Sequence, residues 1–213
     1  MFTGIVQTKA TVVSAKQVDN ILRLVISVGS EYLDKLTLGA SIAINGCCLT
    51  VVSFEQPDND VVGQVCFDVI DETLKLTNLG EVKRGTQVNF ERSMTFGTEL
   101  GGHIISGHIQ TKAYISEICR NEANVKMHVE LSEKWQKYVM YKGFIAVNGA
   151  SLTVGELDHR GFWLHLIPET LSLTNLGHIK VGDSVNIEID QQTYTIINTV
   201  ENYMKRQSLV DKS

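Results

Sequence analysis

The stretch Asn45-Gly46-Cys47-Cys48-Leu49-Thr50-Val51 occurs twice in this chain, the second time as Asn148-Gly149-Ala150-Ser151-Leu152-Thr153-Val154. The offset between the two copies is 103 residues (45 to 148), and most of the first half matches the second half at that offset. After Val51 the offset drops to 97, so that Phe67 aligns with Leu164. The first copy therefore carries a short insertion, which its turn-like composition places at residues 56–60. The chain is an internal duplication, and this decides its architecture.

Each copy contains several short segments in which apolar and polar residues alternate, as they do in half-buried strands. The segments from Leu22 to Val28 and from Val125 to Leu131 are clear examples. Turns rich in Gly, Asn and Asp separate the segments, a spacing typical of a small closed antiparallel barrel rather than of βαβ units. The sequence predicts an all-β chain of two tandem barrels, at residues 1–97 and 98–190, with a linker at residues 94–102.

Helical structure is expected at three kinds of place. Short polar segments beside Tyr32 and Trp135 predict one helical turn each. The repeated segments 72–80 and 169–177 predict one short helix each, ended by glycine. Residues 191–213 have no counterpart in the first copy and carry apolar residues at helical spacing. A lone amphipathic helix of about three to four turns is marginal in water, so it must pack on its own barrel or on equivalent helices of other subunits.

The composition, with 43% hydrophobic residues, is that of an ordinary globular protein. No apolar run reaches the roughly 20 residues that span a bilayer. The first residues lack the features of a secretion signal, so a cytoplasmic location without membrane attachment is the expectation. The net charge is −5 and the 19 Lys and Arg residues are scattered, which argues against nucleic acid as a partner.

The four cysteines are expected to be free thiols, because adjacent cysteines bridge poorly and no Cys-x-x-Cys pair exists to hold zinc. Cys66 and Cys119 are interpreted as small buried apolar residues. Cys48 and its equivalent Ser151 are both nucleophilic residue types, and the second copy shows that the fold does not require sulfur there. We therefore consider both for catalysis, with simple packing as the alternative for Cys48.

Two histidines, His103 and His108, are five residues apart, a spacing that strand alternation sends to opposite faces. They are therefore not expected to chelate one metal ion, and no metal site is predicted. His108 replaces the apolar Ile5 of the first copy, which makes it a candidate for acid–base work, with a hydrogen-bonded structural histidine as the alternative. Three other histidines are expected at the surface: His128, His159 and His178.

The paired segments Glu72-Thr73 and Glu169-Thr170 could bind a polar ligand or could cap the short helices that follow them. Lys142 stands where the first copy has Gly39, and it is either a functional cation or a solvated turn lysine. Phosphate-binding, nucleophile-elbow and metal-ligand motifs are absent from the sequence. The residues alone thus predict a tandem barrel that binds a small polar ligand in sites built from equivalent loops.

A family resemblance rests on five segments that occur in this order: Met1–Val6, Asn45–Val51, Gly101–Ile109, Ser151–Val154 and His165–Leu171. Together they closely resemble the riboflavin synthases of the alpha-chain type, over essentially the whole chain. The resemblance implies two six-stranded Greek-key barrels, followed by a C-terminal helix that mediates a homotrimer. It places each site between the N-terminal barrel of one subunit and the C-terminal barrel of its neighbour.

The implied reaction needs no cofactor and no metal. Two molecules of 6,7-dimethyl-8-ribityllumazine bind in one site and exchange a four-carbon unit, which yields riboflavin and 5-amino-6-(D-ribitylamino)uracil. The resemblance also suggests lumazine synthase as a protein partner. Holding two identical rings face to face can supply on the order of 7–11 kcal/mol through effective molarity.

Matching motifs imply two groups of ligand-binding residues. The first group comprises Gly4, Ile5, Val6, Cys48, Leu49, Thr50, Asp68, Val69, Ile70, Asp71, Glu72 and Thr73. The second comprises Gly107, His108, Ile109, Ser151, Leu152, Thr153, His165, Leu166, Ile167, Pro168, Glu169 and Thr170, with Lys142 reaching across the subunit boundary. Amides and hydroxyls of such segments can read a pyrimidinedione edge, and the glutamates can bind ribityl hydroxyls.

For the chemistry, the candidates are Cys48, His108 and Ser151, as nucleophile and proton-transfer groups, together with Lys142. One departure affects the mechanism. Family members often carry Asp where this chain has Asn148, and an amide cannot act as a general base. A mechanism that needs a carboxylate at this position is therefore not expected here.

Two alternatives to the enzyme remain open from sequence. The first is a non-catalytic lumazine- or flavin-binding antenna protein of luminous bacteria, which shares the fold but tends to lose the reactive residues of one half. In this chain both halves keep a full binding pattern, which favours the enzyme. The second is an unrelated tandem-barrel binding module, which would require the resemblance to be accidental.

Overall fold

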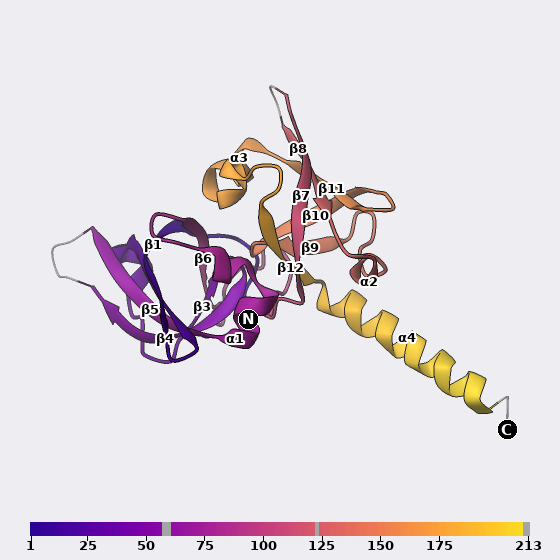
Figure 1. The fold of residues 1–213 in the computed structure, drawn as a ribbon, viewed down its shortest axis with the longest axis horizontal. Helices are drawn as coiled ribbons and strands as arrows, with labels where there is room; N and C mark the ends of the chain where they lie inside the picture. The colour runs from indigo at the N-terminus through magenta and orange to yellow at the C-terminus, as the bar shows by residue number, and fades with distance from the viewer. Residues whose placement is uncertain (57–60, 122–123, 211–213) are drawn as a thin grey trace.

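The computed structural model describes residues 1–56, 61–121 and 124–210. It consists of two closed six-stranded antiparallel barrels and a long helix that projects from the second barrel (Figure 1). The expectation of two tandem barrels with a C-terminal helix is confirmed. Most of the expected insertion at residues 56–60 lies outside the described residues.

The first barrel has the strand order β1-β2-β5-β4-β3-β6. Its strands are β1 Thr8–Val18, β2 Ile21–Gly29, β3 Ser41–Ile44, β4 Cys47–Glu55, β5 Val62–Ile70 and β6 Gln87–Arg92. The apolar residues that alternate along these strands fill the interior, and Leu24 and Ile26 are fully buried there. The barrel core thus follows directly from the period of two in the sequence.

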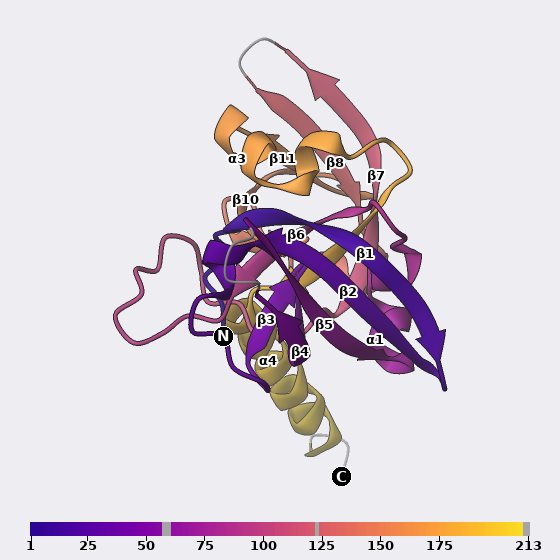
Figure 2. The ribbon, with the colours of Figure 1, turned by 90° about the vertical axis from the view of Figure 1, so that its left-hand side faces the viewer.

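The second barrel has the strand order β10-β11-β8-β7-β12-β9. Its strands are β7 Thr111–Arg120, β8 Val125–Glu130, β9 Phe144–Val147, β10 Ala150–Leu157, β11 Gly161–Leu166 and β12 Ser184–Ile189. The linker at residues 94–102 contains no strand, and it loops away from both barrels in the side view of Figure 2.

Both expected helical turns are present, as η1 Ser30–Leu33 and α2 Glu133–Gln136. The expectation of single helices ended by glycine is wrong, because each forms two short pieces: α1 Asp71–Leu76 with η2 Asn78–Glu81, and α3 Pro168–Leu173 with η3 Asn175–His178. Thr77 and Thr174 are extended and separate the pieces. The hydroxyl of each accepts a hydrogen bond from the N–H two residues later, which starts the next turn.

The segments that precede β1 and β7 exchange barrels. Val6 packs in the core of the second barrel, and its equivalent Ile109 packs in the core of the first. Between these segments, Phe2 and Ile105 form an antiparallel bridge with N–H···O distances of 2.8 and 3.0 Å. Each barrel is therefore completed by the leading segment of the other half.

The twinned Asn-Gly turns meet at the contact between the barrels. A Cβ atom on Gly46 would lie 2.6 Å from the backbone nitrogen of Gly149, so only glycine allows this approach. Asn45 and Asn148 precede these glycines with φ angles of 46° and 47°, a conformation that asparagine tolerates. The shared Asn-Gly pair thus joins the two barrels.

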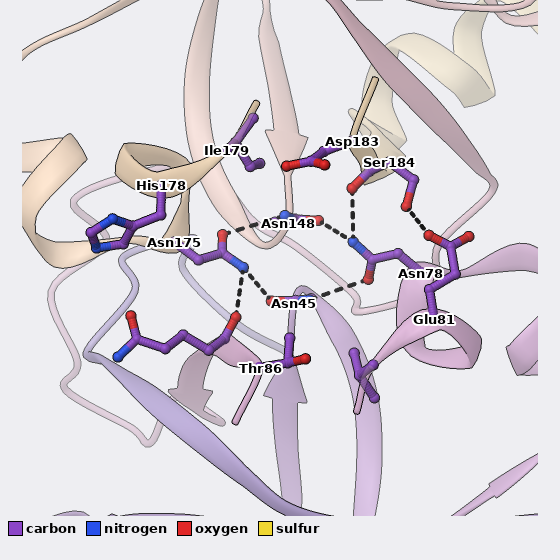
Figure 3. A pocket seen from close by; sticks show the side chains of 12 residues that line it. Asn45, Asn78, Glu81, Thr86, Asn148, Asn175, His178, Ile179, Asp183 and Ser184 are labelled. Atoms are coloured by element: carbon purple, nitrogen blue, oxygen red, sulfur yellow. Dashed lines mark hydrogen bonds between the residues drawn. The ribbon is translucent and has the colours of Figure 1, made fainter. Parts of the chain in front are cut away.

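A ring of four side-chain amides surrounds these turns (Figure 3). Asn45 donates to Asn78 (3.2 Å) and Asn78 donates to Asn148 (3.1 Å). Asn148 in turn donates to Asn175 (3.3 Å), which donates back to Asn45 (3.0 Å). The ring lines a groove of about 350 Å³ and has a local two-fold symmetry. Asn148 is 1% exposed and its side chain is engaged in this ring, so its role is structural.

The C-terminal helix α4, Gln191–Val210, packs its first turns on its own barrel. Tyr194 contacts the rings of Trp135 and Tyr138, and Lys137 pairs with Glu201 at 2.6 Å. Its other face exposes four large apolar side chains: Ile196, Val200, Tyr203 and Met204. The helix therefore docks on its own barrel and also presents an unpaired apolar face. Among the described helices, none combines the length and apolarity needed to cross a membrane.

Two expectations about single side chains are wrong. Cys119, near the end of β7, is exposed and does not act as a small buried residue. His128 is fully buried, because Ser116, at 2.5 Å from its Nδ1 atom, and the ring of Trp163 cover it. The expectation of four free cysteines is confirmed.

Candidate functional site

The equivalent residues Cys48 and Ser151 each lie at the start of a strand, β4 or β10, beside a segment of the opposite half. The N–H of Cys48 donates to the carbonyl oxygen of Gly107 at 2.9 Å, and the N–H of Ser151 donates to that of Gly4 at 2.8 Å. Within one chain, these contacts pair the segments differently from the grouping that the resemblance implies. Gly4, Ile5 and Val6 adjoin Ser151, whereas Gly107, His108 and Ile109 adjoin Cys48.

Glycine is required at both of these contacts. Gly4 and Gly107 have φ angles of 76° and 83°, which L side chains rarely adopt. A Cβ atom on Gly4 would lie 2.6 Å from the Cβ of Ser151, and one on Gly107 would lie 2.5 Å from the Cβ of Cys48. The repeated glycines thus let the backbone of one half lie directly against Ser151 or Cys48 of the other.

The other predicted residues divide by exposure, and this limits which atoms can meet a ligand. Some have buried side chains that pack in the cores: Val6, Leu49, Val69, Ile109 and Leu166. Others are half-buried: Cys48, Asp68, Thr73, Ser151, Leu152 and Thr170. The remaining side chains are exposed: Ile5, Thr50, Ile70, Asp71, Glu72, His108, Lys142, Thr153, His165, Ile167, Pro168 and Glu169. Core residues can offer only backbone groups, whereas the others can offer side chains.

A Ser-His pair that the sequence did not predict occupies the second half. His103 Nδ1 lies 2.6 Å from Ser151 Oγ, and the imidazole, 6% exposed, stacks on Phe144 with ring centroids 5.1 Å apart. Burial lowers the pKa of His103, although the nearby Asp190 carboxylate opposes this shift. A neutral imidazole beside a hydroxyl is an arrangement that can accept and return a proton.

Close approach of His103 depends on its neighbour Gly102. A Cβ atom on Gly102 would lie 2.2 Å from the carbonyl oxygen of Thr3 and 2.8 Å from the Cβ of Ser151. Comparison of the repeats could not reveal the pair, because the 103-residue offset gives His103 no equivalent in the first half. The Gly101-Gly102-His103 motif is the sequence feature that could have pointed to this pair.

The first half carries different chemistry at the equivalent place. Cys48 is half-buried, whereas its neighbour Cys47 is buried, and burial raises the pKa of the Cys47 thiol to about 12. Cys47 is therefore a protonated, inert packing residue, and Cys48 is the sulfur that a ligand can reach. Ser41 takes the place of Phe144. The surroundings of Cys48 and of Ser151 are thus related by duplication but differ in chemistry.

A pocket of about 230 Å³ lies in the second barrel, and three of the predicted residues line it: Lys142, Thr153 and His165. Lys142 has a φ angle of 64°, close to the 80° of the equivalent Gly39. This left-handed conformation is costly for lysine, and such strain is typical of functional positions. His165 lies 2.8 Å from Glu156, and this hydrogen bond is the main cause that lowers the pKa of Glu156 to about 2.

Within the described part of the chain, no three His, Cys, Asp or Glu side chains come together as metal ligands would.

Comparisons with known proteins agree with the two-barrel fold. The lumazine binding domain family matches residues 3–93 and 106–190, one match on each barrel. The chain is 46% identical over 202 residues to the riboflavin synthase of Escherichia coli (strain K12), covering 94% of this chain and 92% of that one. It is 42% identical over 207 residues to the riboflavin synthase of Buchnera aphidicola subsp. Schizaphis graminum (strain Sg), covering 97% of each chain.

Solved structures of LumP are also similar. LumP complexed with riboflavin has a TM-score of 0.79 and 28% sequence identity, and the match covers 90% of this chain and 100% of that chain. LumP complexed with 6,7-dimethyl-8-(1'-D-ribityl) lumazine has a TM-score of 0.77 and 25% identity, with the same coverage. The curated relatives match nearly the full length with higher identity. The chain belongs to the riboflavin synthase family.

Proposed function

We propose that this enzyme converts two molecules of 6,7-dimethyl-8-ribityllumazine into riboflavin and 5-amino-6-(D-ribitylamino)uracil by transfer of a four-carbon unit. The observation that carries this proposal is the pair of equivalent but different reactive ends, one with Ser151 and His103 at 2.6 Å and one with Cys48. In this reaction, one of the two identical molecules has to lose a proton and the other has to accept a nucleophile. Two similar binding segments with different reactive groups meet that need.

In this proposal, the Ser151–His103 pair removes a proton from a methyl group of one ring. The buried imidazole is neutral, so its nitrogen can receive the proton through the Ser151 hydroxyl and return it later. Cys48 adds to the electron-poor second ring and leaves again when the four-carbon unit has been transferred. His108 and Lys142, both exposed, contact the substrates or assist these proton transfers.

The binding residues of the resemblance complete the site, with the grouping that the backbone contacts support. Gly4–Val6, Ser151–Thr153 and His165–Thr170 would hold one lumazine, and Cys48–Thr50, Asp68–Thr73 and Gly107–Ile109 would hold the other. Exposed Glu72 and Glu169 would bind ribityl hydroxyls.

The two rings would stack between the N-terminal barrel of one subunit and the C-terminal barrel of its neighbour in a homotrimer. The exposed apolar face of α4 supports such an assembly. A cytoplasmic location stays a prediction from the first residues of the sequence, and association with lumazine synthase stays a prediction of the resemblance.

Turnover distinguishes this proposal from a LumP-like binding role. The purified protein is incubated with the lumazine, and both products are quantified by chromatography with fluorescence and absorbance detection. We expect one riboflavin for every two lumazines consumed. Tight binding of the lumazine without any riboflavin would favour the antenna protein instead.

A further inference from the structure

Two buried glutamates occupy equivalent positions on the last strand of each barrel. Glu91 lies on β6 and Glu188 lies on β12, at the 97-residue offset of the repeat, and they are 4% and 3% exposed. Neither belongs to the binding segments described above. Since burying a carboxylate is costly unless hydrogen bonds compensate it, two such groups call for a physical account.

Glu91 holds the segment that precedes β1. Its Oε1 atom accepts hydrogen bonds from the N–H of Thr3 at 2.7 Å and from the hydroxyl of Thr3 at 2.8 Å. The N–H of Gly4 lies 3.2 Å from each of the two carboxylate oxygens. The Thr3 hydroxyl also accepts a hydrogen bond from the N–H of Ile5 at 3.2 Å, which extends the arrangement to the next residue.

Glu188 holds the equivalent segment before β7 in the same way. Its Oε1 atom accepts from the N–H of Ser106 at 2.7 Å and from the Ser106 hydroxyl at 2.8 Å, and Oε2 accepts from the N–H of Gly107 at 2.9 Å. The Ser106 hydroxyl accepts a hydrogen bond from the N–H of His108 at 3.2 Å. Through the Ser106 hydroxyl, the Glu188 carboxylate thus also fixes the backbone of His108.

We propose that Glu91 and Glu188 are positioning residues, each of which fixes a reactive end of the opposite barrel. Glu91, on the first barrel, holds Gly4 so that its carbonyl meets the N–H of Ser151. Glu188, on the second barrel, holds Gly107 so that its carbonyl meets the N–H of Cys48. This inference rests on the proposed function, and it adds a coupling: the last strand of each barrel sets the geometry of the other barrel's site.

The acceptor count explains why a carboxylate is used. Each group receives hydrogen bonds on both oxygens, and all the donors are N–H or O–H groups of the held segment. An ionised carboxylate only accepts, whereas glutamine would turn one NH2 group toward these donors. Burial raises the pKa of both glutamates, and the hydrogen bonds from the held segments oppose this shift.

The test uses Glu91→Gln and Glu188→Gln in the full chain, each variant serving as the matched control of the other. Backbone positioning is measured by hydrogen–deuterium exchange without substrate, so this readout does not depend on turnover. We expect Glu188→Gln to speed exchange at least tenfold in peptides covering residues 105–109 and 47–50. Exchange in peptides covering residues 2–6 and 150–153 should stay unchanged. Glu91→Gln should give the reverse pattern. Uniformly faster exchange, or local effects confined to the substituted strand, would overturn the inference.

Turnover is then measured at a temperature where both variants remain folded. We expect Glu188→Gln to lower kcat at least tenfold with a smaller change in KM. Ser116→Ala removes a partly buried hydrogen bond elsewhere in the same barrel and should leave kcat within twofold. A kcat of Glu188→Gln equal to that of the parent would overturn the inference. An inactive parent with the crossed exchange pattern would refute the proposed reaction and leave the positioning role standing.

Discussion

Ser151 Oγ lies 2.6 Å from His103 Nδ1, whereas the equivalent Cys48 has no histidine at the equivalent place. The N–H groups of both residues are bound by glycine carbonyls. Duplication therefore produced two similar segments whose candidate reactive groups differ. Because the proposed reaction uses two copies of one molecule in two different roles, each reactive end can be tested separately.

Replacement of His103 tests the proton-transfer pair. His103→Asn keeps a polar side chain but removes the basic nitrogen, and we expect kcat to fall by about 10²–10⁴-fold, the usual contribution of general acid–base catalysis. Steady-state kinetics with the lumazine checks this. Thermal unfolding serves as the control for folding. A kcat within threefold of the parent would remove His103 from the mechanism.

The lowered pKa of His103 also predicts a pH dependence. The neutral imidazole is the active form, so kcat should be constant near neutrality and fall with acidification below the ordinary histidine pKa of about 6.5. The free energy of unfolding should also fall with acidification. The unfolded state binds a proton more readily, so His103 contributes stability above about pH 6.5 that is lost as the pH falls through its folded pKa. If His103→Gln shows the same acidic loss of stability in urea titrations, another group is responsible.

The two adjacent cysteines should behave differently. Cys48→Ser is expected to lower turnover at least tenfold with the fold intact, because a hydroxyl is a much weaker nucleophile than a thiol. Cys47→Ala is the matched control and should cost stability with little effect on kcat. At pH 8, iodoacetamide should label Cys48 and the exposed Cys119, but not Cys47, whose pKa is about 12. Mass spectrometry identifies the labelled peptides, and labelling of Cys47 before Cys48 would contradict this prediction.

A carboxylate at position 148 should affect stability rather than chemistry. Asn148→Asp removes the donor to Asn175 and adds a buried charge, so we expect the free energy of unfolding to fall by about 1–3 kcal/mol. The equivalent Asn45→Asp should have a similar effect, since the amide ring is symmetric. Denaturant titration measures both. An increase in kcat for Asn148→Asp would show instead that this position takes part in proton transfer.

The exposed face of α4 is predicted to hold the subunits together. Val200→Glu places a charge on that face without touching the docked residues Tyr194 and Glu201, so sedimentation should show species smaller than a trimer. Turnover should fall in parallel, because the site is proposed to form between subunits. Thr199→Glu, on an exposed position of the same helix, is a control for charge alone. An intact trimer for Val200→Glu would mean that another surface mediates assembly.

Much of the fold could be read from the repeat, because alternating residues such as Leu24 and Ile26 define strands that must close around an apolar interior. The exchange of leading segments could not. The repeat shows that Gly4 and Gly107 are equivalent. It does not show whether each glycine contacts its own barrel or the other barrel, because the sequence pattern is the same in both cases. The sequence predicts His128 at the surface, but Ser116 and Trp163, from other strands, cover it.

The exchange of Val6 and Ile109 between the two cores has a consequence for synthesis of the chain. While the ribosome has made only the strands of the first barrel, Ile109 has not yet been added and that barrel lacks part of its interior. The second barrel, in turn, depends on a residue made at the very start. Neither barrel can complete its core without a residue from the other half. The enzyme is therefore expected to fold and unfold as one cooperative unit.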